Sequence, residues 1–561
     1  MPATNQGRNE NTVLITRADA PGQDSHFNWS KNKLYDYGKA VSNTYQLLMN
    51  FDAKNDPNAF HHLLQSQFDA LPEDEVKILE IPVLAPGKDK ICQRIVAIGN
   101  PVILAELRKI PRAETVEPDY FTRNPNTPKI SGGRAFGSVL EAIGMGILSA
   151  EHELHAPFSQ EMIATLTMRS INETPSKTEN SHKPWFIEVV KEETKILINA
   201  MKQAAASQQQ FSPDFRFYAL KVFLRGFYPN ASWKDEWIHQ LSQAIEDISD
   251  SAFKHVVDPY ANVEKLRKEA KLRLDPFIDL IMQEDQSFFL SKDYVAHTTP
   301  DILRQIIISL LFAGGDNIKK YLDHVFVEFG NESIRNRYLK EKPSAEYLKI
   351  LIQEIGRLHT TIYAQPGKAL EDFTIEYKGK KILIKAGDEL HYTTWVANRD
   401  TMEWGPKAGQ FNPEEHQPHY TKLNPLATFG SGSRVCRGKY LTLAMIEYIT
   451  EQALELFSWD ALVNKEKNHH PTEFNFNNGV KGKIEYTFRS RPQAPLVTPE
   501  AIPETAKEKG SRTWGPVSEF SPGMSALSGL FSDHKLPAEP PIVPTNDSTK
   551  EVTETLYINT L

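Results

Sequence analysis

Apolar residues recur every three or four positions over most of the middle of the chain, the spacing that places them on one face of an α-helix. The predicted helices cover 185–206, 213–227, 232–254, 262–283 and the long apolar run 299–329. The same spacing predicts a helix near 347–360 and another behind position 438, where Leu441, Ala444, Met445, Tyr448 and Ile449 recur. The pattern therefore predicts a mainly α-helical protein.

Alternating and continuous apolar runs predict a smaller β-sheet part. Two runs at 76–84 and 92–99 flank Pro86 and Gly87 and form a predicted hairpin, with a helix at 101–109 behind it. Short strands are expected at 373–379 and 382–390 around a glycine turn, and the alternating run 480–489 predicts a last strand.

The two ends of the chain lack this periodicity. Residues 1–30 are polar and aperiodic and are expected to form a disordered leader. Residues 492–561 are rich in Pro, Ser, Glu and Thr and are expected to form a disordered tail. Residues 31–491 remain as one large folded domain.

Composition narrows the class of protein. The 561 residues carry 64 Lys and Arg against 72 Asp and Glu, a net charge of −8, which argues against general nucleic-acid binding. Cys92 and Cys436 are the two cysteines, so no disulfide framework is expected and a reducing compartment fits. The polar N-terminus contains no apolar run for a signal peptide or membrane anchor, so we expect a soluble, cytoplasmic protein.

One cysteine stands in a setting that suits chemistry. Cys436 follows a glycine-bearing turn and directly precedes a predicted helix, whose dipole and free N–H groups favour a thiolate. Arg434 and Arg437 add positive charge nearby. A glycine-shaped loop that presents one anionic sulfur is what an axial ligand to haem iron requires. The alternative is a small buried thiol before a core helix.

Two further motifs lie upstream. Ala313, Gly314 and Gly315 interrupt the long apolar helix just before Asp316 and Asn317. Glycines inside a helix cost roughly 1 kcal/mol each relative to alanine, which indicates a close approach or a distortion there. In the helix near 347–360, Glu354 and Arg357 are three residues apart and close enough to pair on one face.

These motifs resemble, in order and spacing, those of the cytochrome P-450 family. The haem-binding loop of that family reads Phe-x-x-Gly-x-Arg-x-Cys-x-Gly, and every fixed position is present: Phe429, Gly432, Arg434, Cys436 and Gly438. Its central-helix motif, Ala-Gly-x-Asp/Glu-Thr, and its Glu-x-x-Arg pair are also present, with Asn317 in place of the threonine. The resemblance covers about residues 40–490 and implies a single large haem-enclosing domain of the cytochrome P-450 fold.

The resemblance also implies a site. Haem b would be held by the Cys436 thiolate, with Ala313 and Gly314 crossing it on the opposite face. Asp316 and Asn317 would organise proton delivery, and the Glu354–Arg357 pair would support the cysteine loop. His155 and Lys368 lie where the family contacts the haem propionates.

Three positions depart from the family pattern. Ser159 stands where an arginine would follow His155, and Asn317 replaces the proton-relaying threonine. The arginine that completes the Glu-x-x-Arg triad is replaced by Glu415 or His416. We expect His416 to supply the hydrogen bond and Glu415 to point outward, because a second carboxylate beside Glu354 would be repelled.

The resemblance predicts monooxygenation of a small apolar organic substrate with dioxygen. Electrons would come from a separate redox protein of the ferredoxin or flavodoxin type, steered by Arg437 and Lys439. Because Asn317 cannot ionise, a second possibility is a peroxygenase, or an enzyme that rearranges or dehydrates a peroxide. A third is a degenerate, non-catalytic haem-binding protein, suggested by the three departures together.

Overall fold

The computed structural model describes residues 16–17, 64, 67–72, 75–84, 92–108, 110, 130–131, 152–166, 186–257, 263–284, 290–340, 344–362, 364–422, 428–430, 435–463 and 484–491. The tail expected at 492–561 and most of the leader expected at 1–30 lie outside these residues. Thr16–Arg17 of that leader form strand β1, which pairs antiparallel with β2; the disordered leader stays a prediction for the rest of 1–30.

Helices dominate the described residues, and the prediction of a mainly α-helical fold with a small β-sheet part is confirmed. The longer helices are α5 (His152–Leu166), α7 (Phe186–Ser207), α8 (Phe215–Phe227), α9 (Asp235–Val257), α10 (Val263–Ile281), α12 (Pro300–Gly330), α14 (Ala345–Leu358), α17 (Pro413–Lys422) and α18 (Lys439–Leu456). Shorter helices are α3 (Pro101–Leu107), α11 (Lys292–His297), α13 (Glu332–Lys340), α15 (Thr394–Ala397) and α16 (Thr401–Trp404).

The strands among the described residues form three sheets. The largest has the order β1-β2-β3-β8-β5-β4, with β2 (Ile78–Leu84) and β3 (Cys92–Ile98) as the predicted hairpin, and with β8 (Glu389–Thr393), β5 (Ala364–Ala369) and β4 (Ile130–Ser131). Among the described strands of this sheet, β3 and β8 pair in parallel and the other neighbours pair antiparallel. The other two sheets are the hairpin of β6 (Phe373–Tyr377) and β7 (Lys380–Ile384), and the pair β9 (Phe457–Val463) and β10 (Ile484–Ser490).

The single strand expected at 382–390 is in fact two strands in different sheets. Gly387 lies between β7 and β8 with φ of 90°, a backbone conformation that glycine adopts without steric cost. The chain turns there, so β7 returns along β6 while β8 inserts between β3 and β5.

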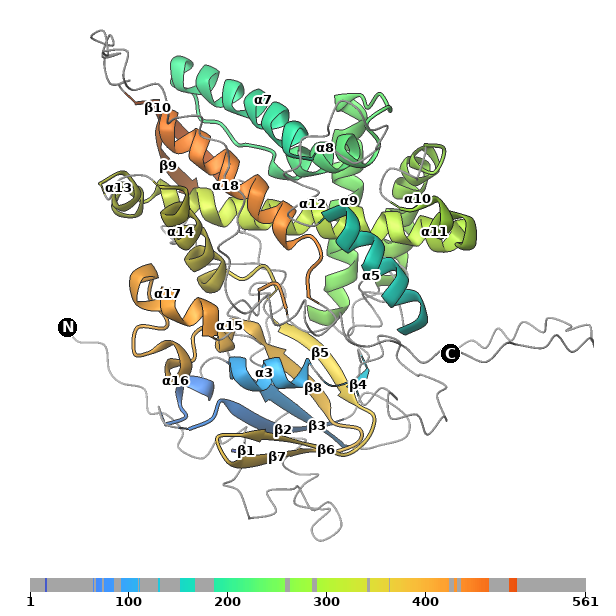
Figure 1. Cartoon of the computed structure of the whole chain (residues 1–561), viewed down its shortest axis with the longest axis vertical. Helices are drawn as coiled ribbons and strands as arrows, with labels where there is room; N and C mark the ends of the chain where they lie inside the picture. Colours follow the sequence, from blue (N-terminus) through green and yellow to red (C-terminus); the bar gives the residue numbers. More distant parts are fainter. Residues whose placement is uncertain are drawn as a thin grey trace, which may run out of the picture. The chain divides into compact units, whose positions relative to one another are not determined.

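The long helix α12 runs through the middle of the helical part (Figure 1). It packs against α8 and α9 on one side and against α14, α18 and β9 on others. Thr299 caps its first turn, since the Thr299 side chain accepts a hydrogen bond from the N–H of Ile302. Most of its residues are buried, and they belong to the main apolar core, which α7, α8, α14 and α18 share. Side chains on α12 are therefore placed deep in the protein.

Candidate functional site

The candidate site begins with an ion pair on α14. Glu354 and Arg357 are both fully buried, and their side chains meet through two hydrogen bonds of 2.8 Å, from Nε to Oε2 and from Nη2 to Oε1. The residues are three apart on one helix face, the spacing from which the pair was predicted. Such a bidentate pair is geometrically specific, and removing one partner would leave an uncompensated buried charge.

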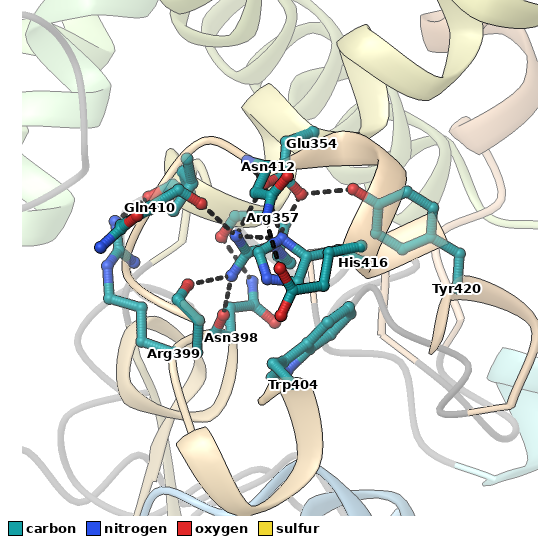
Figure 2. A network of polar contacts seen from close by, with 12 residues as sticks. Glu354, Arg357, Asn398, Arg399, Trp404, Gln410, Asn412, His416 and Tyr420 are labelled. Atoms are coloured by element: carbon teal, nitrogen blue, oxygen red, sulfur yellow. Dashed lines mark hydrogen bonds and ion pairs between the residues drawn. The ribbon is translucent and has the colours of Figure 1, made fainter. Parts of the chain in front are cut away.

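Helix α17 and the residue just before it supply further donors to Glu354 (Figure 2). Nδ1 of His416 lies 2.9 Å from Oε1, and the backbone N–H of Asn412 donates to the same oxygen across 2.9 Å. The Tyr420 hydroxyl donates to Oε2. Burial alone would raise the pKa of the Glu354 carboxyl, but the hydrogen bonds from Arg357, His416 and Tyr420 outweigh it and lower the pKa to about 2.

His416, and not Glu415, takes the position expected to complete this network. Glu415 accepts a hydrogen bond from the Asn412 side chain across 2.5 Å, and its Oε2 lies 3.1 Å from Nζ of Lys407 near the surface. Sequence reasoning did not identify Tyr420, which is four residues after His416 and therefore lies on the same face of α17.

A count of the Arg357 donors assigns the proton on His416. The guanidinium has five N–H groups. Their acceptors are both carboxylate oxygens of Glu354 and the backbone carbonyls of Asn398, Ala408 and Gln410. No hydrogen remains for Nδ1 of His416, although that atom lies 3.0 Å from Nη2. His416 therefore carries its hydrogen on Nδ1 and donates it to Glu354.

The C-terminal end of α14 is capped by side chains from later in the chain. The last carbonyls of a helix have no partner within it. Here the carbonyl of Gly356 accepts from Oγ1 of Thr428 across 3.0 Å, and that of Arg357 accepts from Nδ2 of Asn398 across 3.0 Å. The carbonyl of Leu358 accepts from the Arg399 guanidinium.

Thr428 leads directly into the cysteine loop. Phe429 is buried, and its carbonyl accepts a hydrogen bond of 2.8 Å from the N–H of Cys436, so the two ends of the loop are joined. Gly430 has φ of 71°, which favours glycine at this turn. Gly432 and Arg434 lie outside the described residues, and their expected haem contacts stay predictions.

Cys436 lies three residues before Lys439, the first residue of α18. Its side chain is accessible, although enough protein surrounds it that burial raises the pKa of its thiol. The backbone N–H groups of Gly438 and Lys439 and the nearby positive charges lower that pKa but do not offset burial. The helix terminus alone therefore does not produce the thiolate that we expected. A coordinating metal deprotonates a thiol outright.

The expected proton-delivering acid on α12 lies in a buried charge network. Oδ1 of Asp316 is 3.1 Å from Nη2 of Arg216 on α8, and Oδ2 accepts from Lys320 and, across 2.9 Å, from Ser249 on α9. Burial alone would raise the pKa of Asp316, but the charges of Lys320 and Arg216 outweigh it and lower the pKa to about 2. A carboxylate this acidic is a poor proton donor near neutral pH. This geometry weighs against the proton-delivering role that we expected for Asp316.

Asn317 and Ala313 share the half-exposed part of α12. They are four residues apart on one face, and Nδ2 of Asn317 donates to the carbonyl of Ala313 across 3.2 Å. Gly314, Gly315 and Asp316 between them are buried. The accessible face in the middle of this buried helix is thus lined by a methyl group and an amide.

Gly314 faces a different neighbour from the one that we expected. A Cβ added to Gly314 would come within 2.6 Å of the Phe223 ring on α8, and one added to Gly315 would lie 3.0 Å from Leu220. The glycines therefore allow α8 to approach α12. A contact of Gly314 with haem stays a prediction.

The remaining predicted residues lie in other elements. His155 belongs to α5, and its side chain is outside the described residues. Lys368 is half-buried on β5, opposite Glu389 of β8 in the sheet register. Arg437 and Lys439 are only half-exposed, and Nζ of Lys439 lies 5.9 Å from the centre of the Phe429 ring, which leaves less of their charge available to a partner protein.

These residues fit a haem group held by sulfur. Cys436 offers an accessible thiol at the end of a loop that follows Thr428, which is bonded to α14, and α12 offers an accessible face of small or neutral side chains. No cluster of three or more His, Cys, Asp or Glu side chains among the described residues could hold a metal ion by itself. Cys436 offers one sulfur ligand, the kind that holds the iron in haem–thiolate proteins.

Comparison with known sequences agrees with this arrangement. The sequence model of the family described as "Cytochrome P450" matches residues 332–482. That range includes the Glu354–Arg357 pair, His416, Tyr420 and Cys436. Helix α12, with Asp316 and Asn317, lies before it.

Curated relatives are similar over part of their length. "Cytochrome P450 71A12" of Arabidopsis thaliana is 27% identical over 258 residues, which are 42% of this chain and 49% of the relative. "Indoleacetaldoxime dehydratase" of the same plant is 30% identical over 189 residues, 32% of this chain and 36% of the relative. "Cytochrome P450 monooxygenase g430" of Fusarium sp is 26% identical over 232 residues, 36% of this chain and 40% of the relative. The matches thus span half or less of each of these relatives. Separately, no helix in the described ranges has the length and apolar character needed to cross a bilayer.

Proposed function

Because the chain belongs to the cytochrome P450 family, we propose that it binds haem b through Cys436 and oxidises a small apolar organic substrate with dioxygen. The observation that carries the proposal is the accessible Cys436 thiol on a loop that directly follows Thr428, a residue bonded to α14, within the range that matches the family. When bound, haem supplies the iron that activates dioxygen, and electron donation from a thiolate promotes O–O cleavage.

The chain's own residues would hold and shield this centre. Thr428 and the Phe429–Cys436 hydrogen bond fix the sulfur, and the Glu354–Arg357 pair fixes the helix to which Thr428 is bound. The small Ala313 side chain would leave room beside a bound haem, and the Asn317 amide would offer one neutral hydrogen-bonding group there. We propose that electrons come from a separate protein of the ferredoxin or flavodoxin type.

One observation favours a second reaction. Asp316 is held in ion pairs at a pKa of about 2, and Asn317 does not ionise, so neither residue readily delivers a proton to the half-exposed face of α12 near neutral pH. Dehydration or rearrangement of a substrate that already contains an N–O or O–O bond does not cleave dioxygen. Such a reaction therefore needs no net electrons from outside and no delivery of protons to dioxygen. A relative with 30% identity is named as a dehydratase of an aldoxime.

Two measurements on the full-length chain test these proposals. The reduced carbon monoxide complex should give a thiolate-type spectrum that Cys436→Ser loses; retention in the variant would refute the sulfur ligand. Product formation is then measured under two conditions. In the first, an apolar substrate is supplied with dioxygen, reductant and a redox protein; in the second, an oxime or hydroperoxide substrate is supplied without them. Strict dependence on reductant supports monooxygenation, and turnover without reductant supports the second reaction.

A further inference from the structure

We propose that Asn398 is a positioning residue, which couples the Glu354–Arg357 ion pair to the start of the cysteine loop. The inference rests on the proposed function for its consequence at haem, because the loop presents the sulfur ligand. The coupling itself is argued from contacts among described residues and can be tested with or without haem.

Asn398 contacts the ion pair through both its backbone and its side chain. Its carbonyl accepts a hydrogen bond from Nη1 of Arg357, and its Nδ2 donates to the Arg357 carbonyl across 3.0 Å. Asn398 is fully buried, and it directly follows α15, where its N–H donates to the carbonyl of Thr394 across 3.0 Å. It is therefore held at a defined position against Arg357 (Figure 2).

The same amide group reaches the loop. Nδ2 of Asn398 lies 3.5 Å from Oγ1 of Thr428, a longer and weaker contact than its bond to Arg357. The Thr428 hydroxyl in turn donates to the carbonyl of Gly356 across 3.0 Å. Thr428 thus bonds to α14 and also contacts the side chain of Asn398. The next residue, Phe429, accepts the hydrogen bond from the N–H of Cys436.

The geometry gives a continuous set of polar contacts from the ion pair to the cysteine. Loss of the Asn398 amide would leave the Arg357 carbonyl unsatisfied at a buried helix end, which is costly. It would also remove the lateral contact to Thr428. We expect the loop to become more mobile while α14 and its ion pair persist, because the backbone carbonyl of residue 398 remains.

The first test measures how well the Cys436 N–H is protected by its hydrogen bond to the Phe429 carbonyl. Hydrogen–deuterium exchange of the haem-free chain is followed by mass spectrometry, with fragmentation that resolves the Cys436 amide. Asn398→Ala and Thr428→Val should each raise the exchange rate of this amide roughly fivefold or more, the scale expected for loss of one buried hydrogen bond. Thr428→Ser keeps the hydroxyl and should restore the wild-type rate.

A matched control separates this coupling from general loosening. Thr450 on α18 is fully buried, and its hydroxyl has no hydrogen-bond partner among the described residues. Thr450→Val makes the same chemical change as Thr428→Val without breaking a hydrogen bond, so its rate should equal that of the wild type. An unchanged rate in Asn398→Ala and Thr428→Val, or an equal rise in Thr450→Val, would overturn the proposal.

The second test uses the haem-loaded protein, well below the unfolding transition of each variant. The fraction of the carbon monoxide complex with a thiolate-type spectrum, normalised to haem content, should fall at least about twofold in Asn398→Ala and Thr428→Val. A role in stability alone would lower haem content without changing this fraction. If the wild-type chain shows no thiolate-type spectrum, the proposed function fails, and the exchange rates of the Cys436 amide still decide the coupling.

Discussion

Single side chains at the site are constrained by what lies against them. Gly356 illustrates this: a Cβ added there would come within 2.1 Å of the Tyr321 hydroxyl on α12. That hydroxyl donates to the carbonyl of Ile352 across 2.9 Å, so it cannot move without losing a buried hydrogen bond. The close approach of α12 to the helix with the ion pair therefore requires glycine.

We expect Gly356→Ala to lower the free energy of unfolding by about 1 to 3 kcal/mol, the usual cost of overpacking. Urea denaturation measures the change. Gly409→Ala is the matched control, because a Cβ there would meet nothing within 4 Å. Equal stability of Gly356→Ala and wild type would contradict the close approach.

The charges around Asp316 give a second prediction at this scale. Asp316→Asn leaves the buried Lys320 and Arg216 without their shared carboxylate, so we expect a loss of about 3 to 5 kcal/mol in unfolding free energy. The double variant Asp316→Asn, Lys320→Met removes one of the two cations and should recover part of the loss. A double variant less stable than Asp316→Asn would contradict the view that the charge of Lys320 is the main cost of losing the Asp316 carboxylate.

At the scale of elements, α14 and α17 are joined through one carboxylate. Glu354 accepts hydrogen bonds from Arg357 on its own helix, from His416 and Tyr420 on α17, and from Asn412 just before it. Arg357 also lies over the Trp404 ring, with its Cζ 5.1 Å from the ring centre. The pairing therefore holds two helices and the segment between them in one arrangement.

Tyr420→Phe removes one of these bonds without changing the packing of the ring. We expect a loss of about 1.5 to 3 kcal/mol, the range for a hydrogen bond to a charged group, measured by urea denaturation. Glu354→Gln should cost more, about 3 to 5 kcal/mol, because it leaves Arg357 buried without its counter-charge. A larger loss of unfolding free energy in Tyr420→Phe than in Glu354→Gln would mean that the contact with α17 stabilises the protein more than the ion pair does.

Helices and side-chain pairs could be predicted from the sequence wherever the residues that form them are close together along the chain. The helices near 186–257 and 300–330 followed from periodicity, and the Glu354–Arg357 pair followed from its three-residue spacing. The four-residue spacing of Asp316 and Lys320 predicts an ion pair by the same reasoning, although we did not predict this pair from the sequence. By contrast, the contacts of Arg216 with Asp316 and of Asn398 with Arg357 join residues 100 and 41 positions apart. Only the arrangement of the helices brings these together.

For the whole molecule, the carboxylates predict how stability depends on pH. The folded-state pKa values of Glu354 and Asp316 are both lowered to about 2. The ionised carboxylates therefore add to the free energy of unfolding at any pH above their unfolded-state pKa values, and this stabilisation is lost as pH falls through about 2. Burial raises the pKa of Asp400 to about 6. The stability that Asp400 contributes therefore depends on pH in the opposite direction. It is fully present below about pH 4 and is lost as pH rises through about 6.

We therefore expect the free energy of unfolding to fall steeply between about pH 4 and pH 2, as these two carboxylates take up protons. Urea denaturation at a series of pH values measures the slope. The double variant Asp316→Asn, Lys320→Met lacks one of the two groups and should show a shallower decline. Identical slopes in the variant and wild type would mean that Asp316 does not contribute.

The capping of α14 has a consequence for synthesis of the chain. Two of the caps come from 41 residues downstream of the carbonyls that they satisfy, and the Thr428 cap comes from 72 residues downstream. At roughly 5 to 20 residues per second, the ribosome needs about 4 to 14 seconds to add that last stretch. Until then the final turn of α14 depends on water for its hydrogen bonds. The end of this helix and the cysteine loop are therefore expected to become ordered in the same late step, after Thr428 has left the exit tunnel.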